Sequence, residues 1–375
     1  MDAIEVLDGG FFTTVQDLGR FGYQRYGVPV SGAMDLFALR AANLLAGNPE
    51  SAAALEVTLA GPRIRFLRDM VVAIAGADLQ PRLDDSPAPT WRPFAAPEGT
   101  VLGFGHARDG LRAYIALAGG VDVPVVLGSR STFTRGGLGG VQGRAIRADD
   151  RLHAGQVESG IVRGRSIDAR DVPRYGHDHV VRVVLGPQAD AFTPYGVSTF
   201  LSSAYVVTPK SDRIGCRLEG PVVQHAHSAD IVSDGNPFGA VQVAGDGLPM
   251  VLVADRGTTG GYTKVATVIS ADLPRLAQAL PGDRVSFREV SLAEAHRALR
   301  EQEAILERIT RSAPVAFTSR RLKVTVDGSA YDVSVGLVEQ GRTAPVEGVR
   351  GVAEITGDGR LSTMRYEIGE AGVTR

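Results

Sequence analysis

The segment from Asp255 to Lys264 (DRGTTGGYTK) holds the densest set of groups that could do chemistry. Its glycines let the backbone approach a ligand closely. The amides and hydroxyls of Thr258 and Thr259 could donate to a developing oxyanion, and the Lys264 ammonium would add positive charge. Tyr262 adds a phenol. The segment predicts a polar loop that handles an anion.

Lysine is rare in this chain. Only Lys210, Lys264 and Lys323 are lysines, and arginine holds the other 37 cationic positions. A lysine supplies a compact, mobile ammonium where arginine supplies a planar fork. Codon bias alone is the other explanation, but the place of Lys264 at the end of a Gly/Thr segment favours a functional one.

A second polar cluster lies near the N-terminus, where Asp17 and Arg20 precede Ser31 and Asp35. Ser31 is the predicted N-cap of the helix that follows, and the free amides of that helix end could hold an anion. The alternative is structural. Asp17 and Arg20 would then pair across a turn, and Asp35 would stabilise the helix dipole.

A third cluster is glycine-rich and spans Leu127–Thr132 and Gly136–Arg144. Its amides could converge on a carboxylate or phosphate clamped by Arg130 and Arg144. The spacing matches neither a Walker A loop nor a dinucleotide-binding loop. A flexible loop at a barrel edge is the alternative.

Arg213 and Arg217 form a fourth cluster, in which we expect the two guanidinia to point the same way on either a helix or a strand. Cys216, between them, is the only cysteine, so no disulfide can form within the chain, and we expect a small core residue. Gln242 precedes the Asp255 segment on a short apolar run.

Two His-x-His pairs could place imidazoles on one strand face, at His177 and His179 and again at His225 and His227. Two such pairs could bind a metal. No carboxylate stands at a fixed spacing from them, so structural or surface histidines are the favoured interpretation, and we predict no metal site.

Short runs rich in β-branched residues, broken by 46 glycines, predict a mainly β protein. Three helices are expected, over about 34–45, from about 273 to 280, and from a capping box at Ser291 and Glu294 to about 310. We therefore expect an α+β chain with domains at 1–175 and 176–290, a linking helix at 291–312 and a β-rich tail at 313–375.

The overall composition sets limits on function. The formal net charge is −2, which gives no support to nucleic-acid or anionic-membrane binding. The N-terminus lacks a basic region followed by an apolar one, and no apolar run approaches the roughly 18 to 20 residues of a membrane span. These features predict a cytoplasmic protein.

Five segments together resemble one known family: Thr13–Arg20, Ser31–Asp35, Leu127–Thr132, Ser211–Arg213 and Thr258–Lys264. They are similar to the biotin-dependent carboxyltransferase family, also called allophanate hydrolase subunit 2. That family includes the C subunit of bacterial 5-oxoprolinase and half of the carboxyltransferase domain of urea carboxylase. The resemblance covers roughly residues 4 to 290.

The resemblance implies two subdomains, the second a cyclophilin-like β-barrel, and a partner of the subunit-B type with a related barrel. In the 5-oxoprolinase case it also implies a LamB/YcsF-type subunit and ATP-driven opening of the 5-oxoproline lactam to L-glutamate, with ATP used by the complex. In the urea case, carboxyl would pass from a biotin carried by a partner to an amide nitrogen.

On this resemblance we expect Arg130, Arg213 and Lys264 to hold a substrate carboxylate or phosphate. Thr258, Thr259 and Gln242 would hydrogen-bond the reacting amide, and Asp35 or Asp255 would act as base. Ser31, Arg20 and Tyr262 complete the expected substrate site. A regulatory protein that binds a partner and catalyses nothing is the alternative from another class.

The tail departs from the simple family pattern. Leu322–Gly328 and Tyr331–Val335 are similar to the first hairpin of a biotinyl carrier domain, and Thr343–Gly348 resembles its turn. No lysine follows Lys323, so biotin cannot be attached at the usual site. We expect either a carrier remnant or an unrelated docking hairpin.

Overall fold

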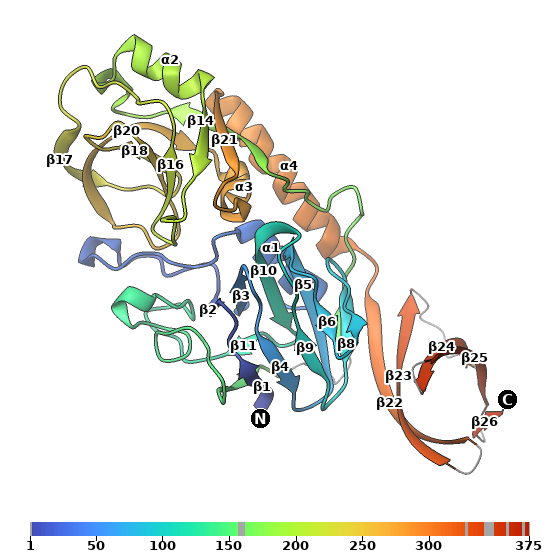
Figure 1. Cartoon of the computed structure of the whole chain (residues 1–375). Coiled ribbons are helices and arrows are strands. Elements are labelled where there is room, and N and C mark those ends of the chain that lie inside the picture. The colour runs from blue at the N-terminus through green and yellow to red at the C-terminus, as the bar shows by residue number, and fades with distance from the viewer. Residues whose placement is uncertain are drawn as a thin grey trace.

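The computed structural model describes residues 2–156, 162–326, 329–340, 349–357, 360–369 and 372–374. Within these residues, strands predominate and four α-helices occur, which confirms the predicted α+β class. Figure 1 shows two β-rich bodies joined along one side by a long helix. The helices are α1 (Leu36–Leu45), α2 (Pro194–Ser202), α3 (Leu273–Gln278) and α4 (Leu292–Arg311).

Two sheets form the first body. The seven-stranded sheet has the order β11 (Val121–Asp122), β12 (Arg151–Ala154), β1 (Asp2–Asp8), β4 (Arg63–Phe66), β9 (Val101–Gly103), β6 (Arg82–Leu83), β7 (Ser86–Pro87). The five-stranded sheet has the order β2 (Phe12–Gln16), β3 (Ala54–Thr58), β10 (Asp109–Leu117), β5 (Met70–Asp78), β8 (Pro93–Ala96). Their facing side chains form one core.

Strand β5 explains how the layers pack. Val72 and Ile74 point into the core between the two sheets, whereas Ala73 and Ala75 belong to a separate core with α1. Since successive side chains of a strand alternate between faces, large residues fill one side and small ones leave room for the helix on the other. The continuous apolar run of β5 thus reflects the burial of both faces of this strand.

The second body is a closed barrel. Its sheet has the order β14 (Asp178–Leu185), β21 (Arg284–Glu289), β15 (Ala204–Val207), β16 (Gly215–Glu219), β19 (Pro249–Leu252), β18 (Ala240–Val243), β20 (Thr259–Val268), β17 (Asp230–Gly235). A further pairing of β14 with β20 closes the ring, and β17 stays outside it on β20. The more specific likeness to cyclophilin stays a prediction.

Helix α4 connects the bodies. It begins directly after the barrel strand β21, with the predicted capping box between Ser291 and Glu294. Its far end packs Leu306 and Ile309 against the core around α1. The Glu303 carboxylate accepts two hydrogen bonds from Arg40 of α1, at 2.6 and 2.7 Å. The predicted domain boundaries around this helix stay predictions.

Two helix predictions need correction. The N-cap of α1 is Asp35, whose side chain accepts from the Ala38 amide; Ser31 lies too far ahead and has a φ of +54°. The prediction also missed α2, although Thr193 caps it and a proline stands in its first turn, a standard start signal. The apolar periodicity of this short helix is too weak to have pointed to it.

The tail forms strands. β13 (Val162–Gly164) pairs with β22 (Val315–Val326), which pairs with β23 (Ser329–Gln340), so the two strands of the predicted hairpin are paired. Residues 327 and 328 between them lie outside the described residues. A second group contains β24 (Val349–Gly357), β25 (Arg360–Gly369) and β26 (Gly372–Thr374). The carrier-like turn Thr343–Gly348 lies outside the described residues.

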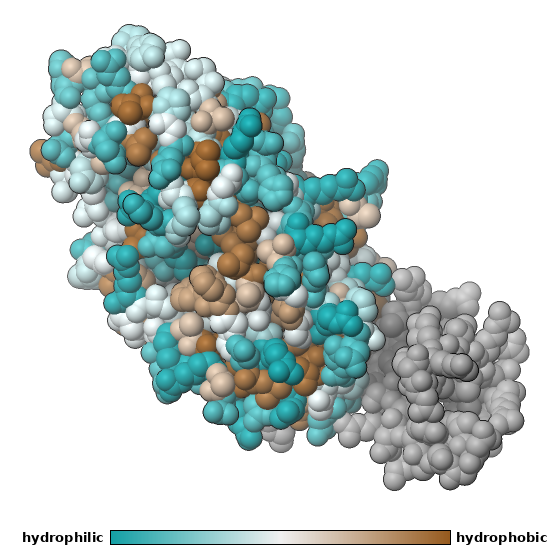
Figure 2. Space-filling model, in the orientation of Figure 1, coloured by the Kyte–Doolittle hydropathy of each residue, from teal (hydrophilic) through white to brown (hydrophobic). Residues whose placement is uncertain are grey.

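Figure 2 shows hydrophobic side chains in small groups, each bordered by hydrophilic ones, over both bodies. Among the helices in the described ranges, none is long and apolar enough to span a membrane.

Candidate functional site

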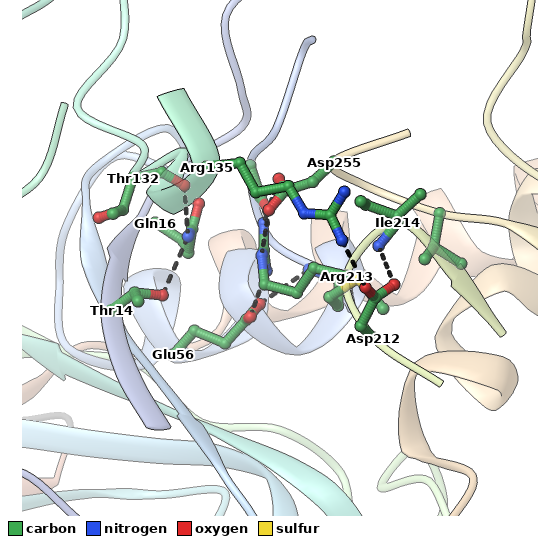
Figure 3. A network of polar contacts seen from close by, with 12 residues as sticks. Thr14, Gln16, Glu56, Thr132, Arg135, Asp212, Arg213, Ile214 and Asp255 are labelled. Carbon is green, nitrogen blue, oxygen red and sulfur yellow. Dashed lines mark hydrogen bonds and ion pairs between the residues drawn. The ribbon is translucent and has the colours of Figure 1, made fainter. Parts of the chain in front are cut away.

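A buried arginine joins the two bodies (Figure 3). Arg213 donates from Nε and Nη2 to the two oxygens of Asp255, at 2.9 and 3.0 Å, and from Nη1 to Glu56. Nη2 also donates to the Gly32 carbonyl at 2.6 Å. Burial alone would lower the pKa of this guanidinium, but the Asp255 and Glu56 carboxylates outweigh it and raise the pKa above its usual range.

Glu56 is shared by further donors from the first body. Tyr114 donates its hydroxyl to Glu56 Oε2 at 2.7 Å, and the Met34 amide donates to the same oxygen at 2.8 Å. Burial, with the nearby Glu56 charge, raises the pKa of Tyr114 well above its usual value, so the phenol stays a neutral donor. Arg213, Tyr114 and the Met34 amide thus all donate to the buried carboxylate of Glu56.

Asp35 lies next to this cluster with no exposed surface. Its Oδ1 accepts from the Ala38 amide and its Oδ2 from Gln278 Nε2, both at 2.8 Å. Burial raises the pKa of Asp35 to about 6, although both hydrogen bonds act in the opposite direction. The structural alternative for this residue, stabilisation of the helix N-terminus, is confirmed.

Lys264 lies in the barrel and is 1% exposed. Its ammonium makes no hydrogen bond within the described structure, and the nearest carboxylate oxygen is Asp234 Oδ2, 3.6 Å from Nζ. Asp234 is on β17, outside the ring, and is more than half exposed. A buried ammonium is costly unless it is paired, and the one ion-pair partner of Lys264 among the described residues is itself exposed to water.

The surroundings of Lys264 connect it to a pocket. Gln242 on β18 stands opposite Lys264 in the strand register and donates to Asn236 Oδ1 at 3.1 Å. Asn236 in turn donates to the Gly257 carbonyl. We call the space beside it the Asn236 pocket. It has a volume of about 420 Å³ and is lined by Gln24, Pro29, Val30, Gly235, Asn236, Pro237, Arg256 and Thr258.

The Asp255–Lys264 segment is a loop only over its first part, because β20 begins at Thr259. Thr258 lines the Asn236 pocket, and Thr259 is exposed. Tyr262 is 42% exposed. Lys264 is therefore held in the middle of a strand, a more rigid position than the predicted loop.

Asp17 organises the third predicted cluster. Its Oδ1 accepts from the Ser129 hydroxyl at 2.7 Å, and its Oδ2 accepts from the Arg130 amide at 2.6 Å. Arg20 is fully buried and donates to the carbonyls of Val126 and Ser131, at 2.9 and 2.8 Å. The predicted pairing of Asp17 with Arg20 is wrong, since both are bonded to the segment between 126 and 131.

The two arginines of the glycine-rich cluster are paired with aspartates. Arg130 Nη2 lies 3.1 Å from Asp122, and Arg144 makes two hydrogen bonds to Asp150 at 2.7 and 2.8 Å. Ser31 is buried, and its hydroxyl has no partner among the described residues. The predicted roles of Arg130, Ser31 and Arg20 in substrate binding stay predictions.

Arg213 and Arg217 do not point the same way. Arg217 is exposed on β16, whereas Arg213 precedes that strand and is buried, so strand alternation does not relate them. Cys216 is buried as predicted, and burial raises the pKa of its thiol to about 11.

The histidines also have structural partners. His177 and His179 both contact the Asp283 carboxylate, at 2.7 and 3.1 Å, and His225 contacts the Thr263 hydroxyl. Within the described ranges no group of three or more His, Cys, Asp or Glu side chains could hold a metal ion.

Sequence reasoning missed Glu56, Asn236 and Arg256. Glu56 had a signal, a lone carboxylate inside an apolar strand, because such a charge needs a buried partner. Asn236 stands in a turn before a proline, and Arg256 lay inside the segment that the prediction emphasised, but neither had a feature that set it apart.

Comparison with known proteins identifies the family of the chain. Residues 26–289 match the family described as carboxyltransferase domain, subdomain A and B. The C subunit of the 5-oxoprolinase of Escherichia coli (strain K12) is 37% identical over 308 residues, covering 82% of this chain and 97% of that protein. A urea amidolyase of Lachancea kluyveri is 36% identical over 326 residues, covering 81% of this chain and 18% of that protein.

A solved structure agrees. The urea carboxylase of Kluyveromyces lactis superposes with a TM-score of 0.77 and 30% identity, covering 84% of this chain and 32% of the urea carboxylase chain. The resemblance found in the five motifs is thus confirmed over both bodies, and the chain belongs to the family of carboxyltransferase domains, subdomains A and B.

Proposed function

We propose that this chain is a subunit of an ATP-dependent 5-oxoprolinase, which opens the 5-oxoproline lactam to L-glutamate together with partner subunits. The observation that carries this choice is the extent of the matches. The similarity to the 5-oxoprolinase C subunit of Escherichia coli spans 97% of that protein, and the similarity to the Lachancea kluyveri urea amidolyase spans 18%. The partners are a subunit-B-type protein and a LamB/YcsF-type protein, and the complex works in the cytoplasm.

The chemistry assigned to this chain is the stabilisation of charge on the lactam oxygen. As the carbonyl carbon is attacked, negative charge grows on that oxygen, and a fixed ammonium in a site of low dielectric constant lowers the energy of this state. Lys264 supplies the ammonium, whose one ion-pair partner in the described part of the chain is Asp234. Thr258 and Gln242 supply hydrogen-bond donors beside the Asn236 pocket. ATP supplies the driving force of the complex and is not assigned a site on this chain.

Asp255 and Asp35 receive positioning roles in place of the base role. Both oxygens of Asp255 accept from Arg213, and both oxygens of Asp35 accept from Ala38 and Gln278. Asp255 fixes the start of the segment that leads to Thr258, and Asp35 fixes α1. Arg213 likewise holds the two bodies together and is not free for a substrate anion.

Reconstitution tests the proposal. The chain, copurified with its subunit-B-type and LamB/YcsF-type partners, should release glutamate from 5-oxoproline only when ATP is present. The second candidate function, transfer of carboxyl from a biotin-bearing partner to urea or another amide, is favoured by the likeness to urea carboxylase. It predicts a copurifying biotinylated protein and urea-dependent ATP hydrolysis, and that pair of results would overturn the first candidate.

A further inference from the structure

Arg256 is partly buried, and it differs from Arg213 and Arg182 of the barrel because no carboxylate of the described residues forms an ion pair with it. Its Nε donates to the Asn236 carbonyl at 2.8 Å and its Nη1 approaches the Val253 carbonyl at 3.3 Å. The guanidinium also lies 5.2 Å from the centre of the Phe238 ring. Two carbonyls and an aromatic face fix its orientation but do not neutralise its charge.

The charge of Arg256 is poorly compensated. No carboxylate of the described residues lies within ion-pair distance of it, and neighbouring Asp255 already accepts from Arg213. Burial lowers the pKa of Arg256 to about 10, although the charge of nearby Asp255 acts in the opposite direction. A guanidinium so placed gains most from an anion that enters from outside.

The rest of the pocket lining is neutral. Arg256 is its only charged residue, and Gln24, Asn236 and Thr258 add amide and hydroxyl groups. Gln24 Oε1 already accepts from the Gly22 amide, which leaves the NH₂ group as its donor to a ligand. Pro29, Val30 and Pro237 add apolar wall. The volume of about 420 Å³ suits a small molecule with an apolar ring and one anionic group.

We propose that the Asn236 pocket binds the carboxylate of a small cyclic acid, with Arg256 as its ionic partner. The identification of that acid as a lactam acid rests on the proposed function. Urea is neutral and would leave Arg256 unpaired, so this site selects for carboxylate-bearing amides. The lactam carbonyl would then lie toward Gln242 and Lys264, which Asn236 connects to the pocket.

Binding to the full chain tests the site, since every lining residue belongs to this chain. Four probes are titrated by calorimetry: 5-oxoproline, 2-pyrrolidinone (the same ring without the carboxylate), cyclopentanecarboxylate (the ring carboxylate without the lactam) and inorganic phosphate. We expect 5-oxoproline and cyclopentanecarboxylate to bind and 2-pyrrolidinone to bind at least roughly tenfold more weakly. Equal binding of 2-pyrrolidinone and 5-oxoproline, phosphate binding in preference to both acids, or no binding at all would overturn the proposal.

Variants assign the effect to Arg256. Arg256→Gln should weaken 5-oxoproline binding by roughly tenfold to a hundredfold and leave 2-pyrrolidinone binding unchanged. Arg256→Lys, which keeps the charge and loses the fork, should fall between the two. Arg288→Gln, at an exposed arginine of β21, is the matched control. Unchanged binding in a folded Arg256→Gln would contradict the proposal.

The two proposals fail separately. If cyclopentanecarboxylate binds in an Arg256-dependent way but the reconstituted complex releases no glutamate, the carboxylate site stands and the 5-oxoprolinase assignment falls. If the complex turns over 5-oxoproline with the same KM in wild type and Arg256→Gln, the assignment stands and the carboxylate site falls.

Discussion

The two arginines that flank Asp255 in the structure have opposite environments. Arg213 is bonded to two carboxylates and a carbonyl, and its charge is fully compensated within the protein. Among the described residues, Arg256 has carbonyl and aromatic neighbours and no ion pair. Lys264 has one acid at 3.6 Å, and its ammonium makes no hydrogen bond within the same residues. The comparison shows that burial alone does not mark a functional cation. The compensated charge of Arg213 holds structure together, and we propose that the less compensated charges of Arg256 and Lys264 serve a ligand.

The largest effect is expected at the compensated arginine. Arg213→Met leaves Glu56 and Asp255 buried without their cation, so the free energy of unfolding should fall by about 3–5 kcal/mol. Urea unfolding of the variant and the wild type measures this difference. A loss under about 1 kcal/mol would show that the contact between the two bodies does not depend on Arg213.

The pH dependence of stability that Asp35 confers tests the same contact between the two bodies. Because the pKa of Asp35 is raised in the folded protein, the folded state binds the proton more tightly than the unfolded state does. This group therefore stabilises the fold below pH 4, and that contribution is lost as pH rises toward about 6. The stability of Asp35→Asn relative to wild type should therefore improve across that interval, by on the order of 3 kcal/mol. Unfolding of both proteins at a series of pH values measures this difference. If their unfolding free energies changed in parallel with pH, the raised pKa of Asp35 would be contradicted.

The smallest effect is expected for an exposed ion pair that also connects the two bodies. Arg135 lies 3.5 Å from Asp212, with side chains 69% and 46% exposed. Water and salt weaken such pairs, so Arg135→Ala should change the unfolding free energy by less than about 0.5 kcal/mol. A loss comparable to that of Arg213→Met would show that exposure does not separate the two pairs.

Much of the fold follows from local sequence, and the site follows from it less well. The capping box at Ser291 and the buried run at Met70 each specify their element through nearby residues. The contact between Arg213 and Glu56 joins residues 157 positions apart, so no local pattern indicates it.

The Asp255–Lys264 segment shows the same limit. Its glycines led to the prediction of a loop, yet Gly260 is part of a strand. A side chain there would meet the amides of Gln242 and Asn236, at 2.7 and 2.8 Å. This glycine serves close packing of the tertiary structure, and only the folded structure distinguishes that use from a turn.

The central claim is that the ammonium of Lys264, paired with a single exposed carboxylate, serves the reaction and not the fold. The most direct test compares Lys264→Met with the exposed control Lys210→Met in the reconstituted complex, measuring both glutamate release and melting temperature. We predict that Lys264→Met lowers turnover by roughly a hundredfold or more while the melting temperature stays the same or rises, and that Lys210→Met changes neither. Full activity of Lys264→Met, or a fall of activity and melting temperature together, would contradict the account.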